Sequence, residues 1–368
     1  MSCLEYKIFH SSASAIEVAL QELLTQSDRI ALTPVRLVFF SHITCNEEYS
    51  KQRAAIEAIC KEHYKDSAPM LALIAQAPLE SAFALEATYA DDKRVKISRY
   101  ENYITLDDNM LLSGAIYASA NNSISEQSDK IFTSLGEMLS SEGYSINNIV
   151  RQWNFIENIT HLSPEGQNYQ QFNDSRSRFY ALVEWPNGYP AATGIGTACG
   201  GVTVIVDVLR NSNQYSWPID NPLQISAHSY SQRVLINNQD QPNKSTPKFE
   251  RARLVRWNDA DMIYISGTAA IRGEDSCQQS NIEQQTDLTM ENIKYLISQK
   301  NLPNEIAPGK GEFENSLLRI YLKHRFNWPE VKQWISDNCK GITTLCVEAD
   351  ICRSELLVEI EGIANKNS

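Results

Sequence analysis

The chain has 368 residues, of which 42% are hydrophobic and 21% charged, and its formal net charge is -12. These values are typical of a globular chain of two to three domains, at about 100 to 150 residues a domain. A nucleic-acid surface normally needs a basic stripe, and the sequence shows none. We therefore expect no nucleic-acid partner, and a ribonuclease activity receives no support.

Targeting and metal-binding signals are also missing from the sequence. Residues 1–7 have neither a basic start nor an apolar core, and no run approaches the roughly 18 apolar residues of a transmembrane helix. The eight cysteines lack the spacing of a disulfide framework, and the six histidines are isolated. We expect a reduced, cytoplasmic protein with no membrane partner, no metal and no cofactor.

Three apolar runs, each followed by a polar turn and a helix-period segment, divide the chain into similar αβ units. The runs lie at residues 36–42, 110–114 and 262–267. In the second and third units the helical positions agree without a gap: Ile124, Gln127, Ser128, Asp129, Leu135, Met138 and Leu139 match Ile282, Gln285, Thr286, Asp287, Ile293, Leu296 and Ile297. The first unit is degenerate, because only Gln52 and Ile56 fall into this register and no later middle strand is visible.

Each later unit continues with a middle strand, a second helix and a closing hairpin. In the second unit these are residues 149–156, 169–180 and 191–209, and in the third unit 317–323, 329–338 and 342–363. Strands that alternate with helices in this way predict an α/β fold, in which helices cover one face of a sheet.

The other sheet faces need cover as well, so the units are expected to pack sheet to sheet around a shared centre. A solenoid is the alternative, but these units are longer than typical solenoid repeats. We expect a monomer with an internal pseudo-trimer, and a functional site between units. The predicted ranges are a degenerate unit at 1–95, a second unit at 96–210, a crossover at 211–250 and a third unit at 251–368. The crossover is a long irregular stretch in which residues 223–230 could form a short strand.

Four ordered blocks give the sequence a resemblance to a known family. They lie at residues 168–176, 190–196, 221–227 and 350–362, and together they resemble the chorismatases, which are Rid (YjgF)-fold enzymes. The resemblance covers roughly residues 105 to 364. It implies cleavage of the enolpyruvyl ether of chorismate, or of a related cyclic carboxylate, to pyruvate and a dihydroxycyclohexadiene or hydroxybenzoate.

Cleavage of an enol ether needs a general acid, that is, a carboxyl group with a raised pKa in a dry site. Glu359 and Glu361 lie on one face of the last predicted strand because side chains alternate. Both could instead face solvent on an edge strand. The resemblance implies that Glu359 is the catalytic acid and leaves Glu361 a structural role.

The substrate would be a small dicarboxylate, so arginine should gather near it despite the acidic composition. Arg353 and Arg176, with Tyr169 of the same block, are the predicted binding residues. Thr193 and Gly194 are followed by a strand and not by a helix, so they do not form a phosphate loop. A glycine here instead allows a ligand to approach the backbone closely.

Two small residues, Ala269 and Cys346, are the expected walls of the cleft, and the Cys346 thiol is expected to be buried and inert. By register, Gly194 takes the place of Cys346 and Asp207 that of Glu359.

Two alternatives remain open at this point. The chain could be a catalytically silent Rid-fold protein that binds a small carboxylate metabolite. It could also be an imine deaminase, but Rid deaminases carry an arginine two residues before the hairpin cysteine. Thr344 and Ala192 occupy that place here. The chain also departs from the chorismatase pattern after Tyr230, where the usual Tyr-Pro segment is missing.

Overall fold

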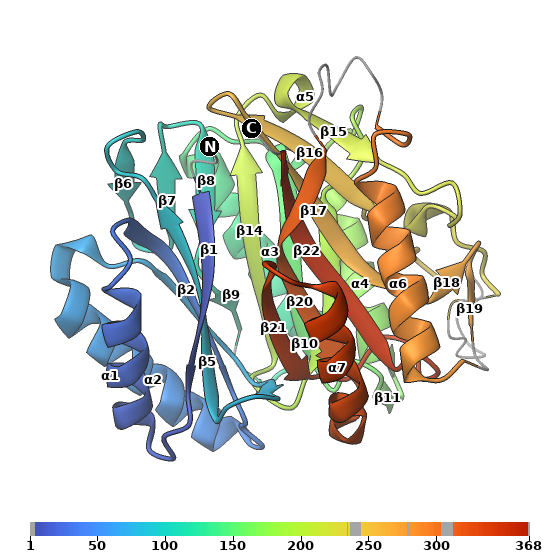
Figure 1. Cartoon of the computed structure of the whole chain (residues 1–368). Helices are drawn as coiled ribbons and strands as arrows, with labels where there is room; N and C mark the ends of the chain where they lie inside the picture. The colour runs from blue at the N-terminus through green and yellow to red at the C-terminus, as the bar shows by residue number, and fades with distance from the viewer. Residues whose placement is uncertain are drawn as a thin grey trace.

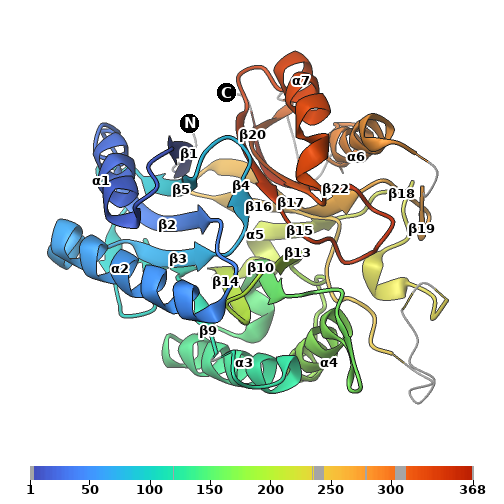
Figure 2. The ribbon, with the colours of Figure 1, turned by 90° about the horizontal axis from the view of Figure 1, so that it is seen from below.

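The structure is a computed structural model that describes residues 4–118, 120–233, 235, 244–277, 280–302 and 312–366. Strands fill its interior and the long helices lie outside them in pairs, as the two views show (Figures 1 and 2). The predicted α/β fold class is confirmed.

The first sheet has the strand order β1-β5-β2-β3. Its elements are β1 (Leu4–Ser11), α1 (Ile16–Ser27), β2 (Thr33–Ser41), α2 (Asn46–Tyr64), β3 (Met70–Ile74) and β5 (Phe83–Ala90).

The second sheet has the order β13-β10-β14-β8-β7-β6, with β9 beside β14. Its elements are β6 (Ile97–Arg99), β7 (Tyr103–Leu106), β8 (Met110–Ser113), β9 (Ile116–Tyr117), α3 (Ile124–Ser141), β10 (Ile149–Glu157), α4 (Asn168–Tyr180), β13 (Ala191–Thr197) and β14 (Val202–Leu209).

The third sheet has the order β15-β16-β17-β22-β20-β21-β4, so the first unit lends it one short strand. Its elements are β4 (Ala77–Pro78), β15 (Ser216–Ile219), β16 (Ala252–Trp257), β17 (Ala260–Ala269), α6 (Ile282–Leu296), β20 (Phe313–Leu322), α7 (Trp328–Asn338), β21 (Thr343–Glu348) and β22 (Val358–Lys366). Small elements complete the fold: β11 (Leu162–Ser163) with β12 (Gly166–Gln167), β18 (Ile271–Arg272) with β19 (Asp275–Ser276), and α5 (Ser212–Tyr215).

One four-strand order recurs in all three sheets: β1-β5-β2-β3, β8-β14-β10-β13 and β17-β22-β20-β21. In each, a middle strand (β2, β10 or β20) pairs parallel with the strand that follows its helix and antiparallel with the last strand. The exact threefold symmetry of the arrangement stays a prediction.

This pairing corrects two sequence predictions. The run at residues 36–42 belongs to β2 and so corresponds to the middle strands β10 and β20, while β1 opens the first unit. The closing strands do not form hairpins either, because β10 lies between β13 and β14, and β20 lies between β21 and β22. Apolar strands joined by a short turn resemble a hairpin in sequence, and only the insertion of the middle strand separates them.

The helical register predicted for the second and third units is matched by equivalent contacts. Ser123 and Asn281 each begin a helix with a capping box. The Gln127 amide oxygen accepts a hydrogen bond of 2.9 Å from the backbone N–H of Val202, and Gln285 accepts one of 2.9 Å from that of Leu357. Each glutamine thus fixes the start of the last strand of its unit to the first helix.

The inner faces of the three sheets share one hydrophobic core, to which Phe40, Trp153 and Tyr264 each contribute from a different sheet. Three further cores lie between each sheet and its own helix pair. The sheets therefore pack against one another around a common centre, as expected from their apolar faces.

Three buried arginines cross this centre, each from a middle strand to a carboxylate of another sheet. Arg36 of the first sheet contacts Asp207 of the second at 2.5 Å. Arg151 of the second contacts Glu361 of the third. Arg319 of the third contacts Glu86 of the first at 2.6 and 2.8 Å, so the three pairs close a ring, which we call the central ring.

Trp153 lies within this ring, with its ring centroid 4.9 Å from the guanidinium carbon of Arg36, 4.6 Å from that of Arg151 and 5.8 Å from that of Arg319. Such cation–π contacts stabilise guanidinium groups that have lost their water.

The crossover differs from its predicted form. The short strand lies earlier than residues 223–230, at β15, which pairs antiparallel with β16. A single 3₁₀ turn at Ala227–Ser229 follows instead. Across the described ranges no helix has the length and apolarity to span a membrane.

Removing one charge from the central ring should be costly. Asp207→Asn leaves Arg36 buried without its carboxylate, so we expect a loss of about 3 to 5 kcal/mol in the free energy of unfolding, measured by urea denaturation. Asp129→Asn is the control, because its pair with Arg178 is half exposed and should contribute below about 1 kcal/mol. Equal midpoints for the two variants would contradict a structural role for the ring.

Candidate active site

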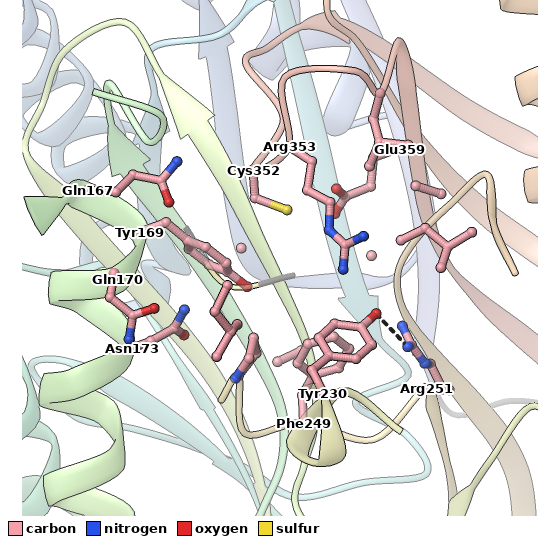
Figure 3. Close-up of a pocket in the computed structure, with 18 residues that line it drawn as sticks. Gln167, Tyr169, Gln170, Asn173, Tyr230, Phe249, Arg251, Cys352, Arg353 and Glu359 are labelled. Carbon is pink, nitrogen blue, oxygen red and sulfur yellow. Dashed lines mark hydrogen bonds between the residues drawn. The ribbon is translucent and has the colours of Figure 1, made fainter. Parts of the chain in front are cut away.

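A pocket lies where the second unit, the third unit and the crossover meet (Figure 3). The second unit contributes Tyr169, Gln170 and Asn173 from the start of α4, and Gly194 from β13. The pocket is therefore built between units.

The third unit provides the facing wall from adjacent strands and from the segment between β21 and β22. Gly267 and Ala269 come from β17, Glu359 from β22, and Cys352 and Arg353 from the connecting segment. The crossover closes the remaining side with Tyr230 and Phe249, together with Arg251, which directly follows it.

Glu359 lies in the interior and not on a solvent-facing edge. Its strand β22 runs between β17 and β20, where Glu359 is opposite Ala269 on one side and Tyr321 on the other. Only 5% of its surface is exposed. The edge-strand alternative is therefore wrong for both carboxylates, since Glu361 is 2% exposed.

A bulge in β17 makes room for the Glu359 carboxyl group. The pairing with β22 shifts between Ile265 and Thr268, which leaves two residues opposite one, and Gly267 falls within this irregularity. A Cβ atom on Gly267 would lie 2.0 Å from Glu359 Oε1. Glycine is thus required here by the carboxyl group itself.

The two carboxyl groups on this strand differ in charge state. Burial and, to a lesser extent, the nearby Glu361 carboxylate raise the pKa of Glu359, Arg151 and Arg353 act to lower it, and the net result is a pKa of about 8. Burial also acts to raise the pKa of Glu361, but Arg319, Arg151 and hydrogen bonds from Thr193 and Tyr321 outweigh it and lower that pKa. A proton donor therefore stands beside a fixed anion.

Glycines in β13 permit close contacts with other parts of the chain, and the close approach of a ligand to Gly194 stays a prediction. A Cβ atom on Gly194 would lie 2.8 Å from Cε2 of Tyr169, so the tyrosine ring packs against bare backbone at the pocket wall. The Gly196 N–H donates to the carbonyl of Asp350 at 2.8 Å, which joins the second unit to the segment carrying Arg353.

Of the predicted site residues, Glu359, Arg353, Tyr169, Gly194 and Ala269 line the pocket. The other three, Thr193, Arg176 and Cys346, lie outside its lining.

Thr193 lies behind the pocket, where its hydroxyl accepts a hydrogen bond of 3.0 Å from the N–H of Gly267 and contacts Glu361. Arg176 is buried behind Asn173 and donates to its amide oxygen at 2.6 Å.

Cys346 lies on the opposite sheet face, in the core with Val358 and Ile360. It is therefore no wall of this pocket, and burial raises the pKa of its thiol.

Both register predictions are wrong. Ala192 pairs with Gln152 as Cys346 pairs with Ile320, so Ala192, and not Gly194, corresponds to Cys346. Asp207 pairs with Arg151 as Glu361 pairs with Arg319, so Asp207 corresponds to Glu361 and not to Glu359.

The sequence prediction missed several residues of the pocket lining, among them Cys352, Tyr230 and Arg251. Cys352 directly precedes the predicted Arg353 in one of the four blocks, and this adjacency could have indicated it. Tyr230 lies within the irregular crossover and Arg251 directly follows it, and no periodicity there shows which side chains face inward.

The fold is that of a solved chorismatase, whose crystal structure superimposes with a TM-score of 0.71 over 98% of both chains at 19% identity. A family model described as "Chorismatase FkbO/Hyg5-like, N-terminal" matches residues 87–207. A 3-hydroxybenzoate synthase of Streptomyces hygroscopicus is 29% identical over 63% of this chain and 67% of its own. A chorismatase of Streptomyces rapamycinicus is 28% identical over 63% and 68%. These matches confirm the predicted relationship to the chorismatases.

The raised pKa of Glu359 has a consequence for stability. Between the ordinary pKa of 4.5 and about 8, the folded chain keeps a proton that the unfolded chain releases. Stability should therefore fall as pH rises through this window and level off above it. Glu359→Gln lacks this contribution. Urea denaturation at several pH values should therefore show that the free energy of unfolding of the variant increases relative to that of the wild type from pH 4.5 to 8.

Glu314→Gln removes an exposed carboxylate from β20 and should follow the wild-type curve. Parallel curves for wild type and Glu359→Gln would show that Glu359 is ionised throughout.

Proposed function

We propose that the protein is a chorismatase, which cleaves the enolpyruvyl ether of chorismate and releases pyruvate. The observation that carries this proposal is the buried Glu359, whose pKa is raised to about 8 beside the ionised Glu361. An enol ether needs a proton donor that stays protonated near neutral pH, and the kinship to chorismatases supports the same chemistry.

In the proposed reaction, the Glu359 carboxyl group gives its proton to the methylene carbon of the enolpyruvyl group. The double-bond electrons form the new C–H bond, and positive charge develops at the ether carbon and oxygen. Water then adds to that carbon, and the resulting hemiketal breaks its bond to the ring oxygen. Pyruvate and a dihydroxycyclohexadiene leave, and the proton lost by water restores Glu359.

The neighbouring ring hydroxyl can trap the cation in place of water and gives up its proton. Loss of the ring proton at the ether carbon then breaks the bond between that hydroxyl oxygen and the ring, which makes the ring aromatic. The oxygen takes up a proton to leave a hemiketal on the original ether oxygen, and this hemiketal collapses to pyruvate and a hydroxybenzoate without net uptake of water. The 3-hydroxybenzoate synthase relative supports the hydroxybenzoate product. Ala269 lines the pocket near Glu359 and is the small wall residue in place to affect this choice, whereas Cys346 is not.

Charge complementarity supports an anionic substrate. Arg251 and Arg353 line the pocket, and the amide side chains of Gln170 and Asn173 face them from α4 (Figure 3). Arginines suit carboxylates, and amides suit ring hydroxyl groups. A silent binding protein would not need a buried carboxyl group with a raised pKa. An imine deaminase is disfavoured because Thr344, and not an arginine, stands two residues before Cys346.

Glu359→Gln should remove the proton donor and preserve the shape of the pocket. We expect pyruvate release from chorismate to fall about 10²- to 10⁴-fold, which is the usual contribution of a general acid. Glu314→Gln is the control, because Glu314 is exposed on β20 and does not line the pocket. An active Glu359→Gln would move the acid to another group, and an inactive wild type would refute the proposed function.

The rate should also depend on the protonation of Glu359. Because only the neutral carboxyl group can donate, turnover should decline as pH rises through about 8. The rate of pyruvate release, followed from pH 6 to 10, gives this profile. A rate that rises across pH 8 would mean that the ionised form is the active one.

A further inference from the structure

We infer that Arg251, Tyr230 and Arg353 form a carboxylate fork that receives the enolpyruvyl carboxylate and so orients the substrate toward Glu359. This inference rests on the proposed function and assigns roles to Arg251 and Tyr230, which the sequence did not single out.

The fork is assembled from three distant segments. Arg251 directly precedes β16, Tyr230 follows the 3₁₀ turn of the crossover, and Arg353 lies between β21 and β22. The guanidinium carbons of Arg251 and Arg353 lie 5.4 and 5.2 Å from the Tyr230 ring centroid. Figure 3 shows both guanidinium groups next to this ring, with Arg353 toward Glu359.

Neutral groups hold both arginines in place. Arg251 Nη2 donates to the Tyr230 hydroxyl at 2.7 Å and to the carbonyl of Ile225. Arg353 Nη1 donates to the carbonyl of Glu274 at 2.8 Å and to the Ser276 hydroxyl at 3.1 Å. These contacts orient each guanidinium group without neutralising its charge.

Neither arginine has a carboxylate oxygen within 4.0 Å among the residues that the structure describes. Arg251 is 3% exposed, and its Nε–H also has no acceptor there. The contrast with the central ring is direct, because Arg36, Arg151 and Arg319 each contact a carboxylate. A buried charge is costly unless it is paired, so the buried Arg251, with the partly buried Arg353 beside it on the same pocket wall, favours an anionic ligand.

The position of the fork selects which carboxylate it binds. In an enolpyruvyl ether, one carbon carries both the methylene group and the carboxylate. If Glu359 protonates the methylene group, this carboxylate must lie near Glu359, and Arg353 is the arginine on that side of the pocket. The ring and its own carboxylate then extend toward the α4 wall with Gln170 and Asn173.

Calorimetric titration with pyruvate and with 3-hydroxybenzoate as separate probes tests the fork without turnover. Arg251→Gln should weaken pyruvate binding about tenfold or more. Arg251→Lys keeps the charge but not the planar guanidinium group, so its affinity for pyruvate should lie between those of Arg251→Gln and the wild type. Binding of 3-hydroxybenzoate should change less than about threefold, because its carboxylate marks the ring end of the substrate.

Arg256→Gln is the matched control, because Arg256 lies on β16, the strand that Arg251 directly precedes, and already contacts Asp261 at 2.6 and 2.9 Å. It should leave both affinities unchanged. Tyr230→Phe removes the hydroxyl that accepts from Arg251 and keeps the ring, so it is a milder variant in case Arg251→Gln does not fold. It should also weaken the binding of pyruvate more than the binding of 3-hydroxybenzoate.

Unchanged pyruvate affinity in folded Arg251 and Tyr230 variants would overturn the inference, as would an equal loss for both probes. The two proposals fail separately. If the wild type binds pyruvate through the fork but releases none from chorismate, the proposed function fails and the fork stands.

Discussion

The central ring of buried arginine–carboxylate pairs is the interaction on which the rest of the structure depends. Arg36, Arg151 and Arg319 each bridge from one sheet to a carboxylate of another, so every sheet is joined to both others. Taking such charges out of water is expensive, and the cost is offset only when every partner is in place. The ring therefore favours one relative placement of the three sheets, which apolar packing alone would define less sharply.

The ring also sets the chemistry of the pocket, because Glu361 belongs to both. Arg319, Arg151 and Tyr321 hold Glu361 ionised, and its charge acts on Glu359 two residues earlier on the same face. The residues that correspond to Glu359 in the other sheets are Ile205 and Glu86, which lie opposite Trp153 and Val38 as Glu359 lies opposite Tyr321. Ile205 cannot donate a proton. Glu86 is bound by Arg319, and the position of Glu361 beside it is taken by Thr88, so the pair of acid and anion occurs on β22 and not on β14 or β5.

Three chain segments of different origin complete the site. Tyr169 comes from the second unit, Glu359 from the third and Arg251 from the end of the crossover. The backbone contact between Gly196 and Asp350 holds the first two together, and the bulge at Gly267 gives the acid its space. The irregular crossover is thus a wall of the pocket as well as a connection between units.

The sequence by itself determined the elements whose signal is local. Helical periodicity predicted α3 and α6, and the four blocks indicated the family and held four of the five predicted residues that line the pocket. Strand pairing depended on tertiary structure, because a middle strand enters between two strands that are neighbours in sequence. Tertiary structure also decided which face of the sheet the Cys346 side chain occupies and that Arg251 faces the pocket. Burial and charge pairing arise only when distant segments meet, so the protonation of Glu359 was decided by the fold.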